Sequence, residues 1–406
     1  MNKFNISAQP IDRRRFLKGA LIGAGAISLG NRLSLPNSIA SEASIVTTRP
    51  YNGPNIIIIR FGGGVRRPET IDPDHTYSPF LCKELAPKGT LFKNMEIISQ
   101  EGIETSHGEG TLNILTGKYD NYKDVGGKFL GARFESKVPT VFEYLRKEYE
   151  IPEYQTLIIN GEDRTDEEFY TFSNHHLFGL RYRSTVLSLY RFKTHLLRRQ
   201  ISNWKGPVEN LNEKKQELKN LEELDHRDVE RSARTPEIEA FWERWRQYYG
   251  ESGLVNPRGD RLLTELAIRA MRELKPKMMM VNYQDSDYVH WGNITHYTRA
   301  IAIMDEGLQR IVRAAEANEE YHNNTIFVVV PDCGRDDNRF VAVPCQHHFG
   351  SKSAHEIFAL LLGPGIAQGQ VVDKKVDQIS VAPTIGRLMG VKTEFSEGPV
   401  LEQALA

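Results

Sequence analysis

Four short apolar runs alternate with amphipathic stretches between residue 55 and about residue 390. The runs are "NIIIIRFGGG" (55–64), "KPKMMMVNYQDSD" (275–287), "TIFVVVPD" (325–332) and "IFALLLGPG" (357–365). A continuous apolar run that ends in turn residues is typical of a buried parallel strand. Between the runs, stretches such as residues 299–320 repeat apolar residues every three to four positions, as amphipathic helices do. This alternation predicts an α/β sandwich around a mostly parallel sheet, with the chemistry at the carboxyl ends of the strands.

The middle of the chain has a different pattern. Residues 169–250 are rich in Arg, Lys, Glu and Tyr and contain two prolines. We expect a helical insertion at about residues 165–255. This insertion either caps the active face or is a solvent-exposed helical segment without a role in substrate binding. The charge pattern favours neither of these alternatives.

The first forty residues have the plan of an export signal. Arg13 and Arg14 are followed by Phe16, Leu17 and Lys18, which matches the twin-arginine pattern ahead of a weakly apolar stretch of small residues. That stretch, residues 19–30, is too short to span a bilayer. We therefore expect a signal peptide and linker over residues 1–43, a single domain over residues 44–406, and a periplasmic or secreted protein without a stable membrane span.

Charge and cysteine content narrow the function further. The chain has 52 basic and 53 acidic residues among 406, so no overall field attracts nucleic acid. Three cysteines are too few, and odd in number, for a disulfide framework, although one bridge is possible. The twin-arginine route exports folded proteins that often carry a cofactor. The export signal therefore makes metal ligands in the rest of the chain a reasonable expectation.

Two polar segments hold residues that bind divalent metals. Asp285, Asp287 and His290 follow the second apolar run, and oxygen and nitrogen ligands at this spacing suit zinc, manganese or iron. Such clusters also occur in ordinary surface loops. The pair His347 and His348 precedes the last run, and adjacent histidines usually direct only one side chain toward a given site.

Two further segments are candidates for nucleophile, base or ligand. Asp332 and Cys333 end the third apolar run, and Cys333 is a metal ligand, a nucleophile or a small buried filler. Ser106 and His107 lie in a glycine-containing turn before a helical segment, where they either face an anion or form a helix cap.

In order along the chain, these segments resemble the alkaline phosphatase superfamily, which includes the sulfatases. The matching segments are "HGEGTLNILTGKY", "NYQDSDYVHWGN", "NTIFVVVPDCGRD", "HHFGSKSAHEIFALLLGPGI" and "VDQISVAPTIGRLMG". The resemblance implies a three-layer sandwich and a divalent metal ion, with zinc first and manganese or calcium as alternatives. It also implies one metal site formed by Asp287 (or Asp285), His290 and His348.

The second metal site of that family is altered in this chain. Gly62 or Gly63 stands where the first strand usually ends in an aspartate ligand. The position of the nucleophile falls on His107, and the usual Asp-His pair becomes Asp332 and Cys333. With these departures, the chain resembles a sulfatase-like branch of exported proteins of unknown function.

The export signal and this resemblance together imply an exported, metal-dependent hydrolase of phosphate or sulfate esters with an atypical active site. Its substrate is a small molecule or a glycan ester, and its export partner is the twin-arginine machinery. In this hypothesis Arg335, and also Arg66 or Arg67, binds the oxyanion, while His107 acts as base, covalent acceptor or ligand and Ser106 is the neighbouring nucleophile candidate. The alternative is a binding or scaffold protein that kept the fold and lost activity.

Overall fold

The computed structural model describes residues 49–406 except 101, 121, 125–133, 162–169, 172, 174–176, 224–234, 252–258, 291–292, 338–344 and 348–350. The predicted signal peptide and linker, residues 1–43, therefore lie outside the described residues. Within the described part of the chain, every helix is too short or too polar to cross a bilayer.

The strands of the structure are β1 (Asn55–Phe61), β2 (Thr90–Glu96), β3 (Tyr122–Asp124), β4 (Phe134–Ser136), β5 (Thr156–Ile159), β6 (Thr185–Leu187), β7 (Met278–Tyr283), β8 (Thr325–Pro331), β9 (Glu356–Leu362), β10 (Gln370–Val372) and β11 (Val376–Asp377). The α-helices are α1 (Arg67–Ile71), α2 (His107–Thr116), α4 (Val141–Tyr149), α6 (Leu189–Ser202), α7 (Val208–Glu223), α8 (Pro236–Tyr249), α9 (Asp260–Glu273), α10 (Ile294–Glu316), α11 (Lys352–His355) and α12 (Val381–Met389). Short 3-10 or π turns include η1 (Phe80–Leu85), η2 (Ala86–Lys88), η3 (Glu153–Gln155), η4 (Leu180–Tyr182), η5 (Asp287–Val289), η6 (Gln378–Ser380) and η7 (Glu402–Ala404).

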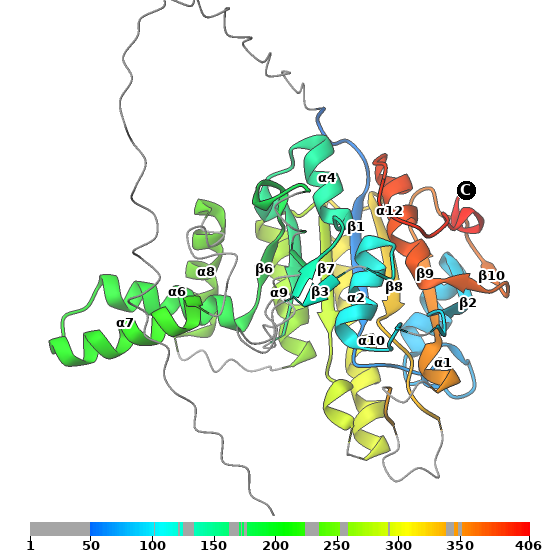
Figure 1. Cartoon of the computed structure of the whole chain (residues 1–406), viewed down its shortest axis with the longest axis horizontal. Coiled ribbons are helices and arrows are strands. Elements are labelled where there is room, and N and C mark those ends of the chain that lie inside the picture. Colours follow the sequence, from blue (N-terminus) through cyan, green and yellow to red (C-terminus); the bar gives the residue numbers. More distant parts are fainter. Residues whose placement is uncertain are drawn as a thin grey trace, which may run out of the picture. The chain divides into compact units, whose positions relative to one another are not determined.

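One large mixed sheet, mostly parallel, runs through the molecule (Figure 1). Its strand order is β10-β2-β9-β8-β1-β7-β5-β6, and β11 pairs with β2. The central strand β1 is parallel to both β7 and β8. The exception among the predicted strands is β9, which runs antiparallel to β8 and β2. The predicted α/β fold around a mostly parallel sheet is confirmed.

Alternating side chains of β1 serve two separate cores. Ile57, Ile59 and Phe61 pack in one core with helices α8, α9 and α10. Ile56 and Ile58 pack in the other core with helices α2, α4 and α12. Because successive strand residues point to opposite faces, the sheet is the middle layer between two helical layers.

The region predicted as a helical insertion contains α6, α7 and α8, but it also contains a strand of the main sheet. Strand β6 pairs in parallel with β5 at the sheet edge, and α6 and α7 extend beyond it at the left of Figure 1. Helix α8 places Trp242 and Trp245 in the core, whereas Val208 on α7 is 65% exposed. Of the three described helices in this region, α7 has the solvent-exposed character of the second alternative, whereas burial of aromatic side chains ties α8 to the domain.

The carboxyl ends of three central strands meet at one edge of the sheet. In the register of the sheet, Phe61 at the end of β1 lies opposite both Tyr283 of β7 and Pro331 of β8. The segments that follow these strands begin at Gly62, Gln284 and Asp332. This edge is therefore the expected place for a functional site in a parallel sheet.

Candidate metal centre

Four side chains converge beyond this edge of the sheet: His107, Asp287, His290 and His347. His107 begins α2, Asp287 and His290 lie in the segment after β7, and His347 precedes α11. The Oδ1 atom of Asp287 is 2.7 Å from Nε2 of His107, 2.7 Å from Nε2 of His290 and 3.8 Å from Nε2 of His347. The cluster therefore directs three imidazole nitrogens and one carboxylate oxygen at a common point.

Each of the three rings is held through its other nitrogen. Nδ1 of His107 lies 2.8 Å from Oδ2 of Asp332. Nδ1 of His290 lies 2.7 Å from Oε1 of Gln346, and Nδ1 of His347 lies 2.7 Å from the carbonyl of Thr105. An acceptor at Nδ1 fixes the orientation of each ring, and an ion bound at Nε2 would take the place of a proton there. This is the support that metal-binding histidines usually have.

The spacing of the cluster fits one divalent ion. Nε2 of His290 lies 3.1 Å from Nε2 of His347. Two nitrogens bound at about 2.0–2.1 Å to a tetrahedral zinc ion are about 3.3 Å apart, so little movement is needed. This contact has the length of a hydrogen bond, and a cation bound by both Nε2 atoms would take the place of the shared proton. The donor set therefore fits a single ion of the zinc type.

The four side chains of the cluster differ in their exposure to solvent. The His347 side chain is fully buried, those of His107 and His290 are 19% and 20% exposed, and that of Asp287 is 39% exposed. Burial raises the pKa of Asp287, but hydrogen bonds from His107, His290 and His347 lower it more, so the carboxyl is ionised. Asp287 is thus the member of the cluster that faces solvent.

The carboxylate of Asp332 lies behind His107 and is already satisfied by other groups. It accepts backbone N–H groups from Gly63, Gly64 and Cys333 at 3.1, 3.2 and 2.7 Å, besides its contact with His107. Nη1 of Arg60 lies 3.4 Å from Oδ2 of Asp332, and both side chains are buried. Burial raises the pKa of Asp332, but the charges of His107 and Arg60 lower it more.

The glycine run after β1 gives Asp332 part of this support. Gly63 and Gly64 have φ angles of 81° and 74°, which glycine adopts without a steric penalty and most other residues avoid. In this conformation both N–H groups point at the carboxylate of Asp332. Gly63, one of the two glycines considered for the position of the family's aspartate, therefore holds Asp332 through its backbone, together with Gly64.

A second group of possible metal ligands lies beside His107. The candidates are Asp332 and Cys333, whose Sγ is 3.9 Å from Nδ1 of His107. Burial and the charge of Asp332 raise the pKa of the Cys333 thiol to about 11 when no ion is bound, so an ion at this position would have to displace the thiol proton. The guanidinium of Arg60 already neutralises Asp332. Cys333 is a free, buried thiol, as are Cys345 and Cys82, which excludes the bridge left open by the sequence.

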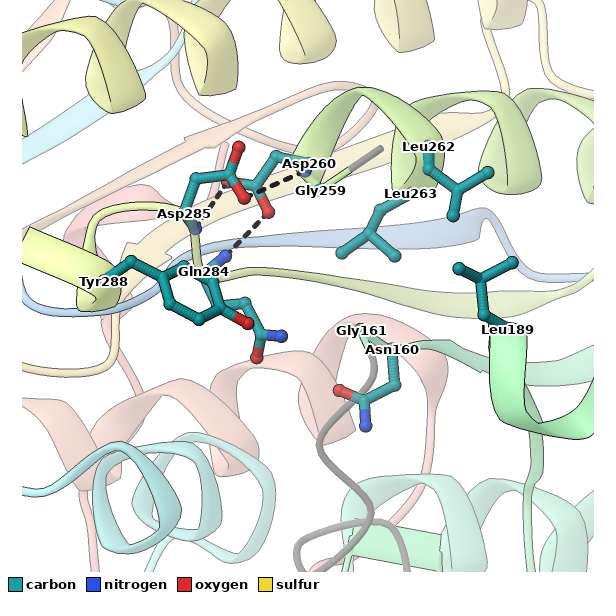
Figure 2. Close-up of a pocket in the computed structure, with 10 residues that line it drawn as sticks. All are labelled: Asn160, Gly161, Leu189, Gly259, Asp260, Leu262, Leu263, Gln284, Asp285 and Tyr288. Atoms are coloured by element: carbon teal, nitrogen blue, oxygen red, sulfur yellow. Dashed lines mark hydrogen bonds between the residues drawn. The ribbon is translucent and has the colours of Figure 1, made fainter. Parts of the chain in front are cut away.

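Two residues named from the sequence, Asp285 and Ser106, lie outside the cluster. Asp285 accepts the N–H of Asp260 at 3.2 Å and lines a cavity on the other side of its loop (Figure 2). Ser106 is the N-cap of α2, and its hydroxyl accepts the N–H of Glu109. His348 lies outside the described residues, and its neighbour His347 takes the place expected for it.

Arg335 has a different surrounding from the one expected for an oxyanion ligand. It is fully buried and donates to the carbonyls of Gly63, Gly64, Cys345 and Ser286. Its donors hold the backbone of the loops around the cluster and do not face solvent. Its role in this structure is therefore to position these loops.

The two other arginines considered are also engaged. Arg66 pairs with Glu69, and Arg67 donates to the carbonyls of Ile357 and Met95.

Comparison with solved structures identifies proteins that share this fold. No protein-family model matches the chain, and no curated protein matches it in sequence. Solved structures do match. The alkaline phosphatase PafA has a TM-score of 0.56 at 10% identity, over 88% of this chain and 100% of that one. The lipoteichoic acid synthase LtaP from Listeria monocytogenes has a TM-score of 0.51 at 11% identity, over 86% and 74% of the two chains. BT1596, a 2-O GAG sulfatase, has a TM-score of 0.50 at 12% identity, over 86% and 73%. The chain therefore has the fold of the alkaline phosphatase superfamily, as its sequence motifs predicted.

Proposed function

We propose that this protein is an exported hydrolase of phosphate or sulfate esters that works with a single metal ion. The observation that carries the proposal is the convergence of three histidine Nε2 atoms on Oδ1 of Asp287 at the carboxyl edge of the sheet. Two solved structures with this fold are named as an alkaline phosphatase and a sulfatase, which supports hydrolysis as the class of reaction.

The donor set favours zinc over the alternatives. Three imidazole nitrogens and one carboxylate oxygen are a common zinc set, and manganese accepts such ligands with lower affinity. Calcium takes six to eight oxygen ligands, so a site with three nitrogens does not suit it. We therefore propose zinc as the resident ion, held by His107, Asp287, His290 and His347.

The side chains around the ion have separate roles in the proposed reaction. A divalent ion held there would supply Lewis-acid polarisation and neutralise charge on the ester group. Asp332 holds the ring of His107 in one orientation through Nδ1. Gln346 holds His290 from both sides, because its Oε1 faces Nδ1 and its Nε2 donates to the backbone carbonyl of His290.

One observation favours the alternative of an inactive binding or scaffold protein. Asp332, a candidate ligand for a second ion, pairs with the buried Arg60, and the hydroxyl of Ser106 caps a helix. An ester hydrolase of this fold that lacks a second ion has to activate water without it. Turnover, and not metal content, therefore separates the two functions.

The experiment measures hydrolysis by the purified, zinc-loaded protein. An aryl phosphate, an aryl phosphodiester and an aryl sulfate are compared, with His290→Ala as the variant that loses a ligand. His355→Ala is the matched control, since Nδ1 of His355 contacts the Ile97 carbonyl outside the cluster. Turnover of one ester that is lost in His290→Ala and kept in His355→Ala supports the proposal. Equal background in all three proteins supports the inactive alternative.

A further inference from the structure

One buried amide connects the helix that carries His107 to the strand end that carries Asp332. Gln378 lies in η6, between β11 and α12, and is fully buried. Its Nε2 donates to the backbone carbonyls of Pro331 and Asp332 at 3.0 and 2.8 Å. Its Oε1 accepts a hydrogen bond from Nδ2 of Asn113 on α2 at 3.0 Å. The amide of Gln378 therefore bridges two elements of the metal centre, although Gln378 belongs to neither of them.

Helix α2 approaches the end of β8 so closely that only glycine fits at the contact. A Cβ atom added to Gly110 would lie 2.0 Å from the carbonyl oxygen of Asp332 and 2.7 Å from its carbonyl carbon. A side chain at this position would push the helix away from the strand, which explains the glycine. The carbonyl of Asp332 thus packs against α2 and at the same time accepts the amide of Gln378.

The position of α2 determines the position of the His107 ring, because His107 is the first residue of this helix. Nδ1 of His107 lies 2.8 Å from Oδ2 of Asp332, and Nε2 lies 2.7 Å from Oδ1 of Asp287. A metal site requires its ligands to be held within about 0.5 Å of the productive geometry. A contact that holds α2 against the end of β8 therefore holds both nitrogens of His107 in place.

A second link between these elements acts on a different part of Asp332. Arg60 on β1 donates to Thr111 on α2, and its Nη1 lies 3.4 Å from Oδ2 of Asp332. Arg60 thus holds the side chain of Asp332, whereas Gln378 holds its main chain. Because Gln378 is uncharged, its replacement changes the geometry of the site without removing a ligand or a charge.

We infer that Gln378 is a positioning residue for the metal centre. Its amide holds α2 against the end of β8 and thereby sets the place of the His107 ring. The inference rests on the proposed function, since it assigns a residue that orients a ligand of the proposed ion.

The test replaces Gln378 with Met, which is unbranched and of similar length but lacks the amide. Asn55→Leu is the matched control. Asn55 is also fully buried, and its Nδ2 donates to the backbone carbonyl of Glu320 at 2.8 Å, at the start of β1 and thus at the opposite end of that strand from the metal centre. We expect both variants to unfold at lower urea concentrations than the wild type, because each loses a buried hydrogen bond to a carbonyl.

Two readouts distinguish positioning from a general loss of stability. The first is nitrogen-15 NMR of the metal-free protein with labelled histidines, in which the ring nitrogens of His107 report its contact with Asp332. The second is metal binding, measured as zinc affinity and as the visible spectrum of the Co²⁺-loaded protein, which depends on ligand geometry. Gln378→Met should change the His107 signals, alter the Co²⁺ spectrum and lower zinc affinity about tenfold. Asn55→Leu should match the wild type in all three measurements.

A second variant breaks the same link from the side of α2. Asn113→Leu removes the group that donates to Gln378 and should change the His107 signals and zinc affinity in the same direction. In the double variant with Gln378→Met, zinc affinity should fall by less than the product of the two single losses, because one link is broken by either change. Strictly multiplicative losses would contradict the role of the link.

The outcomes separate this inference from the proposed function. If the wild-type protein binds zinc and Gln378→Met keeps either its His107 signals or its zinc affinity, the positioning role is overturned and the metal centre stands. Equal changes in Asn55→Leu would also overturn it. If the wild-type protein binds no zinc, but Gln378→Met alone changes the His107 signals, the positioning of the ring stands and the proposed metal-dependent function fails.

Discussion

Replacing Asp332 with Asn tests whether a buried ion pair has taken the place of a second metal ion. The substitution keeps the shape of the side chain and removes its negative charge. It leaves Arg60 buried without its counter-charge, and it removes the carboxylate behind Nδ1 of His107. Two measurable losses follow, one in stability and one in metal affinity.

The size of the stability loss follows from the geometry. At a separation of 3.4 Å the pair has an attraction of about 5 kcal/mol at an effective dielectric constant of about 20. Removing one partner of a buried pair typically costs about 3–5 kcal/mol. The amide also replaces one acceptor oxygen by a donor that faces backbone N–H groups. We expect Asp332→Asn to lower the free energy of unfolding by about 3–5 kcal/mol, and zinc affinity to fall about 10–100-fold.

The assay is urea unfolding of the metal-free protein, followed by tryptophan fluorescence, together with zinc competition against a chromogenic chelator. Asp373→Asn is the control, since Asp373 is exposed and pairs with Lys93 at the surface. The double variant Arg60→Met with Asp332→Asn should be more stable than the sum of the single changes predicts, because the unpaired charge is gone. A loss below about 1 kcal/mol in the single variant, or strict additivity in the double variant, would refute the reasoning.

Three further predictions concern other parts of the chain. Burial raises the pKa of Glu143 from 4.5 to about 7, so between these values the folded protein holds a proton that the unfolded chain has released. Stability should therefore fall by about 2.5 kcal/mol from about pH 5 to about pH 8. Glu143→Gln should remove this slope in urea unfolding, and an unchanged slope would contradict the assignment. Gln346→Leu should lower zinc affinity about 10–100-fold by releasing His290, and wild-type affinity would show that Gln346 does not position the ring. Changing Arg13 and Arg14 to Lys should retain the full-length precursor inside the cell in fractionation; normal export would count against the twin-arginine route.

Much of the fold was predictable because its strands are continuous apolar runs. The run of Ile56 to Ile59 is buried on both faces, and such a strand needs helices on either side of the sheet. The direction of β9 was not predictable in this way, since apolar pattern does not distinguish parallel from antiparallel pairing. The sheet position of β6 was missed because a strand of three residues gives almost no periodic signal.

The site was partly predictable, and its exceptions have physical reasons. The sequence identified Asp287, His290 and His107 as candidates because they are metal-binding residue types next to the predicted end of a strand or start of a helix. The choice between His347 and His348 depends on the backbone of the loop before α11, which two adjacent identical residues do not reveal. Arg335 looked like an anion ligand, but the carbonyls that it contacts come from distant segments. The sequence does contain a sign of the buried ion pair. Arg60 is a single arginine within an apolar strand, and such a residue requires a buried partner.

The number of metal ions per chain tests the central claim most directly. Native mass spectrometry of the protein after zinc loading and removal of loosely bound metal gives this number without reference to a substrate. The single centre of His107, Asp287, His290 and His347 predicts one zinc ion per chain, and none in His347→Ala. Two ions per chain, or no bound ion in the wild-type protein, would contradict the account.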